Sequence, residues 1–333
     1  MTKIIKLTRE EDIASYDPSP ALKTAIDMAI SLGRPLLLTG KPGTGKTQFA
    51  HWYATNKENK NDFNEVFQFN TKSTSVYNDL FYEYDAVSHF RNKDGDKHVT
   101  DFITLTALGK AIVCVKGFEN IEDERLKKIA ANSDINEEKI KEKSIVLIDE
   151  IDKAPRDFPN DLLHEIENLS FTIKEASPSI KVSLDDSQKE KIIVILSSND
   201  EKNLPDAFLR RCLFHYIEFP KDKELAQIIA KKLSLKKLNE EEITKINQIQ
   251  NLEEIDTIKD FEGLSDKIRL FFQIFNNDNI DKKPYTSECI DWLNYLHKNS
   301  LLNKPMADCV HTLSILLKKD EDFKEAKKML SII

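Results

Sequence analysis

Apolar residues along this chain follow two patterns, helical spacing and short continuous runs. Helical spacing first appears in the stretch 19–33, where the recurring apolar positions are Leu22, Ala25, Ile26, Ala29 and Ile30. Ser19 can cap a helix there, and Pro20 suits its first turn. We therefore predict a helix that starts after Ser19 and ends at Gly33.

Continuous apolar runs predict buried strands at 36–39, 65–69, 144–149 and 191–198, with a fifth at 215–219. Their apolar residues do not alternate with polar ones, which is typical of parallel strands that are covered on both faces. Helical patterns separate these runs, notably at 46–57 and 158–169. Strands that alternate with helices predict an α/β fold built on a parallel sheet.

The pattern changes after Phe219-Pro220, since residues 221–333 show helical spacing only. We expect two domains, an α/β domain over 1–220 and a helical domain over 221–333. The highly charged segment 117–143 predicts a helical excursion on the surface of the first domain.

Composition narrows the class of protein. Hydrophobic residues make up 40% of the 333 residues and charged residues 32%, as in folded soluble proteins. The net charge of −8 argues against a broad nucleic-acid surface, which needs clustered positive charge. The lysine pairs Lys231–Lys232 and Lys236–Lys237 are flanked by acidic residues and favour solvated helix faces.

Targeting and cysteine signals indicate a cytoplasmic protein. The N-terminal stretch is charged and lacks a signal-peptide apolar region, and no apolar run reaches the ~18 residues of a membrane span. The four cysteines form no C-x-x-C pair, which favours reduced thiols and argues against a zinc site.

Glycine is concentrated in one place. The chain has 8 glycines, and three of them lie within residues 40–45. Residues 40–47 fit the phosphate-loop pattern G-x-x-x-x-G-K-[ST], between a predicted strand and a predicted helix. Glycine lets backbone N–H groups crowd a phosphate at a helix N-terminus. We expect Lys46 to reach the β- and γ-phosphates and Thr47 to coordinate Mg²⁺. The expected nucleotide-binding residues of this segment are Gly40, Lys41, Pro42, Gly43, Thr44, Gly45, Lys46, Thr47 and Gln48.

Polar residues follow two other apolar strands. The strand in 144–149 delivers Asp149 and Glu150 at its carboxyl end, where open α/β sheets bind ligands. Asp149 is expected to hold Mg²⁺, and Glu150 to act as general base on the attacking water. Asn199 ends the strand in 191–198 and can orient that water. Two acids and an asparagine also occur in ordinary strand ends, but here they accompany a phosphate loop.

Two adjacent arginines complete the candidate set. Arg210 and Arg211 lie in "LPDAFLRRC", in a chain where lysine is far commoner than arginine. An arginine inserted into another subunit's site can stabilise transition-state charge. A surface salt-bridge pair is the alternative.

These elements, in this order, resemble the AAA+ ATPases, and in detail their MoxR-like branch. The matching stretches are "RPLLLTGKPGTGKTQFA", "DLFYEYDAV", "ALGKAI", "VLIDEIDKAPRDFPNDLLHEIE", "SSNDEKNLPDAFLRRC" and "KKPYTSECIDWL". The resemblance implies a five-stranded core with a helical lid, ATP and Mg²⁺ as ligands, and assembly into a homo-oligomeric ring, often a hexamer. It implies an insertion in the second core helix, carried by 66–90, and a hairpin at 171–186. It also implies a bacterial protein that acts on a client, in some relatives one with a von Willebrand A-type domain.

The resemblance also assigns roles. Asn199 matches the first sensor, and Arg211 matches the arginine finger better than its neighbour Arg210. The second sensor is usually an arginine, and Lys283 stands in the matching region. A lysine supplies the charge without the bidentate fork. Lys41 replaces the acid or proline of many relatives, at a position that needs no particular side chain.

Three functions stay open from the sequence. The first is an ATP-hydrolysing ring that remodels a partner protein. The second is a nucleic-acid-directed motor, possibly using GTP. The third is a nucleotide-dependent assembly switch with little turnover. Stimulation by DNA or by a partner would separate them.

Overall fold

The computed structural model describes residue 13 and residues 16–56, 63–92, 97–135, 140–199, 203–234, 240–258 and 260–331. The charged N-terminal stretch and the pair Lys236–Lys237, both used in the sequence analysis, lie outside the described residues. The chain divides into two compact units. The core unit comprises Pro18–Gly40 and Lys46–Ile217. The helical unit comprises Glu218–Ile333, together with Lys41–Gly45 and the described residues before Pro18.

The core unit is built on a parallel sheet of five strands. In spatial order these are β2 (Phe67–Asn70), β5 (Ser144–Asp149), β8 (Ile192–Ser198), β1 (Leu36–Thr39) and β9 (Leu213–Tyr216). All four neighbouring pairs are parallel. Every residue of β1 and β8 is buried, as the continuous apolar runs predict. The α/β fold class is therefore confirmed.

Two strands differ from their predicted bounds by more than one residue. The predicted strand at 215–219 is found as β9 at Leu213–Tyr216, because its backbone pairs with β1 from Leu36↔Leu213 to Thr39↔Tyr216. The predicted strand at 65–69 is found as β2 at Phe67–Asn70, in register with β5 up to Asn70↔Asp149. In both cases pairing with the neighbouring strand sets the ends, which an apolar run alone does not reveal.

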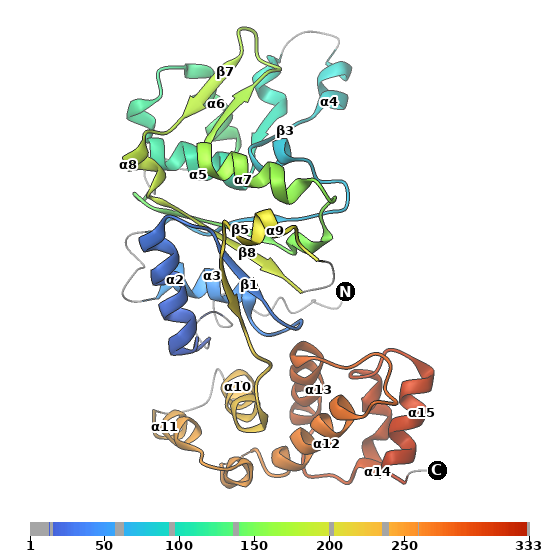
Figure 1. Ribbon diagram of the computed structural model, residues 1–333. Coiled ribbons are helices and arrows are strands. Elements are labelled where there is room, and N and C mark those ends of the chain that lie inside the picture. The colour runs from blue at the N-terminus through green and yellow to red at the C-terminus, as the bar shows by residue number, and fades with distance from the viewer. Residues whose placement is uncertain are drawn as a thin grey trace. The chain divides into compact units, whose positions relative to one another are not determined.

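Helices cover both faces of this sheet (Figure 1). On one face lie α2 (Pro20–Leu32) and α3 (Lys46–Thr55); on the other lie α5 (Ala107–Lys116) and α7 (Phe158–Asn168). The predicted ends of α2 are confirmed: the Ser19 hydroxyl accepts a hydrogen bond from the Leu22 amide, and Gly33 ends the helix in the left-handed conformation.

Further elements extend the core unit beyond α5 and α7 (Figure 1). Between β2 and α5 the chain forms a small antiparallel sheet of β3 (Tyr82–Tyr84) and β4 (Ile103–Leu105), with α4 (Ala86–Arg91) between them. The hairpin expected at 171–186 is present as β6 (Ser170–Ile173) and β7 (Ile180–Ser183). Two short helices, α8 (Asp186–Lys189) and α9 (Asp206–Leu209), flank β8.

The charged segment 117–143 is more closely packed than the sequence indicates. It contains α6 (Glu124–Asn132), whose Leu126, Ile129 and Ala130 are buried in the same hydrophobic core as the sheet. Helix α6 is therefore amphipathic, with its charges directed outward and one apolar stripe directed into the core.

The helical unit has its own core. Its helices are α10 (Asp222–Ser234), α11 (Glu240–Gln248), α12 (Leu264–Asn276), α13 (Thr286–Lys298), α14 (Met306–Cys309) and α15 (Asp320–Met329). Trp292, the largest of its fully buried side chains, donates its indole N–H to the Thr312 hydroxyl at 2.9 Å. The helical character predicted for residues 221–333 is confirmed.

Candidate nucleotide site

The glycine loop joins β1 to α3 through backbone conformations that favour glycine. The φ angles are 146° at Gly40, 77° at Gly43 and 89° at Gly45. A side chain at Gly45 would also collide with Tyr16, because a Cβ there would lie 2.5 Å from the Tyr16 ring. Glycine is thus required in this loop both by conformation and by close approach. Tyr16 was not predicted as a residue of this site, and no motif marks it.

Lys46 begins α3 and is buried, with only 6% of its surface exposed. Its ammonium donates a hydrogen bond to the Gly40 carbonyl at 2.8 Å, so the side chain folds back along the loop. Burial lowers the pKa of Lys46 below its usual value of 10.5, and three nearby carboxylates oppose this shift. A buried cation gains from an anionic ligand that replaces its lost hydration.

Thr47 and Asp149 meet although they are far apart in the chain. The Thr47 hydroxyl donates to Asp149, at 3.0 Å from Oδ2 and 3.3 Å from Oδ1. The fold of the core unit brings the two side chains together, because Asp149 ends strand β5 and Thr47 lies in the first turn of α3. The structure thus brings together the two residues predicted to share Mg²⁺.

Two further side chains orient Asp149, and the sequence analysis missed both. Gln68 of β2 donates its amide to Asp149 Oδ2 at 3.0 Å. Ser197 of β8 donates its hydroxyl to Asp149 Oδ1. The strands on either side of β5 therefore each hold one carboxylate oxygen. The only sequence signal was that both residues are polar and close to a strand's carboxyl end.

Glu150 adopts a left-handed conformation with φ of 57°, which is uncommon for a residue other than glycine. Its amide donates to the Ser197 hydroxyl at 2.9 Å, which fixes this conformation. One carboxylate oxygen of Glu150 lies 2.6 Å from the Lys153 ammonium, and the other accepts from the Asn199 amide at 3.3 Å. The predicted base and the predicted first sensor are thus in contact.

The backbone of Asn199 also forms a hydrogen bond in the site. Its amide N–H donates to the carboxylate of Asp152 at 3.3 Å, and Asp152 is only 2% exposed. Lys153 and Asp152 both lie in the short helical turn Ile151–Lys153, which directly follows Glu150. Neither was predicted as a site residue.

A model of the AAA domain, dynein-related subfamily, matches residues 35–212, which is more than half of the chain. The chain belongs to this AAA domain family. Members of the family are nucleotide-hydrolysing ATPases, so a nucleotide-binding role follows for the chain.

No curated protein matches the chain. A crystal structure of the FIGL-1 AAA domain in complex with ADP is similar at 15% identity, covering 94% of this chain and 82% of that chain, with a TM-score of 0.39. A RuvB variant of Thermotoga maritima is similar at 13% identity, covering 94% of this chain and 68% of that chain, with a TM-score of 0.38.

The residues of this AAA domain fit a nucleotide with Mg²⁺. Thr47 and Asp149 present oxygen donors, which Mg²⁺ prefers. Among the described residues, no group of three or more histidine, cysteine or acidic side chains forms a metal cage. A cation held here would take its remaining ligands from phosphate and water, as Mg²⁺ does in phosphoryl-transfer sites.

Three of the predicted residues make contacts of their own. Arg211 pairs with Glu167 at the end of α7 at 3.5 Å, and both side chains are more than half exposed. Arg210 follows α9 and is also exposed. Lys283 belongs to the helical unit, where its ammonium donates to the Asn277 carbonyl. The roles of these three residues stay predictions.

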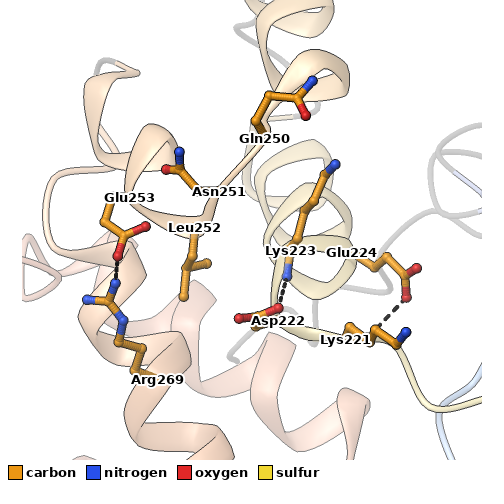
Figure 2. Close-up of a pocket in the computed structure, with 9 residues that line it drawn as sticks. All are labelled: Lys221, Asp222, Lys223, Glu224, Gln250, Asn251, Leu252, Glu253 and Arg269. Atoms are coloured by element: carbon orange, nitrogen blue, oxygen red, sulfur yellow. Dashed lines mark hydrogen bonds and ion pairs between the residues drawn. The ribbon is translucent and has the colours of Figure 1, made fainter.

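The helical unit has a pocket of about 440 Å³, between the start of α10 and the segment 250–253 (Figure 2). Its charges are mixed, since basic and acidic side chains both line it, and Arg269 forms an ion pair with Glu253. A pocket with balanced charges selects no single ligand charge.

Among the helices described, none has the length and apolar character to cross a bilayer.

Proposed function

We propose that this AAA domain protein binds and hydrolyses ATP with Mg²⁺, assembles into a ring and remodels a partner protein, as a member of the MoxR-like branch. One observation carries the hydrolytic part of this proposal. The hydroxyl of Thr47 lies 3.0 Å from Oδ2 of Asp149, the other predicted cation ligand. Glu150, the residue after Asp149, accepts a hydrogen bond from the side-chain amide of Asn199.

Each residue has a task in this mechanism. Lys46 and the loop amides bind the phosphates and position the γ-phosphoryl group. Mg²⁺, when bound, neutralises charge on the phosphate oxygens. Asn199 orients a water, Glu150 accepts its proton as the water oxygen bonds to the γ-phosphorus, and the bond from phosphorus to the bridging oxygen breaks to release ADP and phosphate.

The ring and the branch are supported by other features. The branch assignment is supported by the insertion that carries β3, α4 and β4, and by the β6–β7 hairpin before β8. The proposed ring draws on Arg211, whose exposed side chain pairs with Glu167 on the surface of the core unit. An arginine so placed can act on the nucleotide of a neighbouring subunit.

Turnover of the full chain with Mg²⁺-ATP, compared with Glu150→Gln, tests the hydrolytic proposal. Loss of a general base should lower kcat by about 10²- to 10⁴-fold while ATP still binds. Glu124→Gln is the matched control, because Glu124 is 81% exposed and lies on α6. Near-normal turnover in Glu150→Gln would remove Glu150 from this role.

Measurements across protein concentration, with GTP, and with added DNA separate the alternatives. Turnover per chain that rises with concentration supports a ring with shared sites. A preference for GTP together with stimulation by DNA would favour a nucleic-acid motor instead. Slow turnover that stays constant with concentration would favour an assembly switch.

A further inference from the structure

Both carboxylate oxygens of Glu150 are engaged. The Lys153 ammonium lies 2.6 Å from Oε2, and the Asn199 amide donates to Oε1 at 3.3 Å. The pair with Lys153 spans three residues, because the helical turn Ile151–Lys153 starts immediately after Glu150. The two side chains are 38% and 43% exposed, so the pair lies at the surface of the site.

The ion pair with Lys153 restrains the orientation of Glu150. A general base needs an oxygen lone pair directed at the water that it activates. An ammonium at 2.6 Å takes one lone pair of Oε2 with a charge-assisted hydrogen bond and holds the carboxylate in one orientation. Glu150 therefore turns toward a water more easily once its bond to Lys153 is broken.

We propose that Lys153 is a positioning residue that holds Glu150 in a resting orientation and releases it for each hydrolytic step. The proposal rests on the proposed function, in which Glu150 is the base. It makes the Lys153–Glu150 ion pair a brake on basal turnover, set by the sequence Glu-Ile-Asp-Lys itself.

Lys153 has room to move away from Glu150. Its side chain also lines a pocket of about 540 Å³, together with Arg156, Pro159 and Leu204. The flexible stem of a lysine can swing into such a space without disturbing the core. Asn199 can take part in the release, because it bonds to Glu150 through its side chain and to Asp152 through its backbone.

The test compares kcat and KM for Mg²⁺-ATP in the full chain and its variants. Lys153→Met keeps the length of the stem and removes the charge. A pair this exposed stabilises the resting orientation only modestly, so we expect kcat to rise about two- to five-fold. KM should stay within about two-fold, because Lys153 does not bind the phosphates in this proposal.

Two variants serve as controls. Lys153→Arg keeps the charge and should stay close to the wild-type rate. Lys127→Met removes an ammonium with the same spacing from its partner, Glu124, at 2.8 Å, and should leave kcat unchanged. In the Glu150→Gln background, Lys153→Met should have no effect, because the group it restrains is gone.

A kcat that falls or stays constant in Lys153→Met overturns the proposal, and so does an equal rise in Lys127→Met. The proposed function fails separately, if the wild type does not hydrolyse ATP or if Glu150→Gln hydrolyses it normally. Wild-type turnover that depends on Glu150, without acceleration in Lys153→Met, refutes the restraint alone.

Discussion

Ser197 joins Asp149, the predicted Mg²⁺ ligand, to Glu150, the predicted general base, through a single hydroxyl. It donates to Asp149 and accepts from the Glu150 amide at 2.9 Å, and only 1% of its surface is exposed. Ser197→Ala would remove both hydrogen bonds without adding bulk. We expect this variant to destabilise the core unit.

The magnitude follows from the two bonds. A hydrogen bond to a charged group contributes about 1.5–3 kcal/mol, and a buried amide left unpaired costs about 1–3 kcal/mol. Asp149 keeps the donors Thr47 and Gln68. The free energy lost with its hydrogen bond from Ser197 therefore lies at the low end of the first range. The expected decrease in the free energy of unfolding is about 3 kcal/mol, or roughly 6–12 °C in Tm for a unit of this size.

The two tryptophans allow an assay of the core unit alone. Trp52 lies in α3 of the core unit, whereas Trp292 lies in α13 of the helical unit. In a Trp292→Phe background, Trp52 fluorescence follows urea unfolding of the core unit only. Thr106→Val is the control, because the Thr106 hydroxyl is buried and has no hydrogen-bond partner among the described residues.

Ser197→Ala should lower the urea midpoint at constant slope, whereas Thr106→Val should change it little. A loss below about 0.5 kcal/mol in Ser197→Ala, equal to that of the control, would refute the reasoning. The Ser197 hydroxyl would then not hold Asp149 and Glu150 together in solution.

Three further predictions concern binding, assembly and acid stability. Lys46→Ala should abolish nucleotide binding in a titration with a fluorescent ATP analogue, since it removes the buried cation of the loop; unchanged affinity would contradict the phosphate-loop assignment. Arg211→Ala should bind ATP but lose about 10³-fold in turnover, and mixing it with Lys46→Ala chains should restore part of the activity; a mixture without rescue argues against action on a neighbouring site. Hydrogen bonding to Arg125 holds the pKa of Asp123 in the folded protein below its usual 3.8. The contribution of Asp123 to stability is therefore complete above pH 3.8, the unfolded-state pKa. It is lost as the pH falls through the lower pKa of the folded state. Asp123→Asn should therefore cost roughly 0.5–1 kcal/mol near pH 6 and much less near pH 2 in urea unfolding; an equal cost at both pH values would show that ionisation is not the cause.

Local signals predicted the elements that short stretches of chain specify. Ser19 and Gly33 mark the ends of α2 because capping and left-handed conformations depend on neighbouring residues alone. The strand, glycine loop and α3 were predictable for the same reason: the φ angles of Gly43 and Gly45 are local properties. The fold class followed from the continuous apolar runs.

Strand register was less predictable. The apolar run at 215–219 suggested the wrong bounds for β9, which lies at the edge of the sheet and pairs with β1 alone. Phe214 and Tyr216 are 59% and 44% exposed, so hydrophobicity does not mark the side that is covered. The charged segment 117–143 concealed a buried stripe, because the three buried residues of its helix α6 are spaced among charged residues.

The sequence by itself determined which residues can bind phosphate, hold Mg²⁺ and accept a proton, because residue type and local spacing decide those capacities. Only the tertiary structure decided which side chains converge on Asp149. Thr47, Gln68 and Ser197 lie 102, 81 and 48 residues away from it in the chain. They meet because β5 lies between β2 and β8, and strand order depends on long-range pairing that no local pattern encodes.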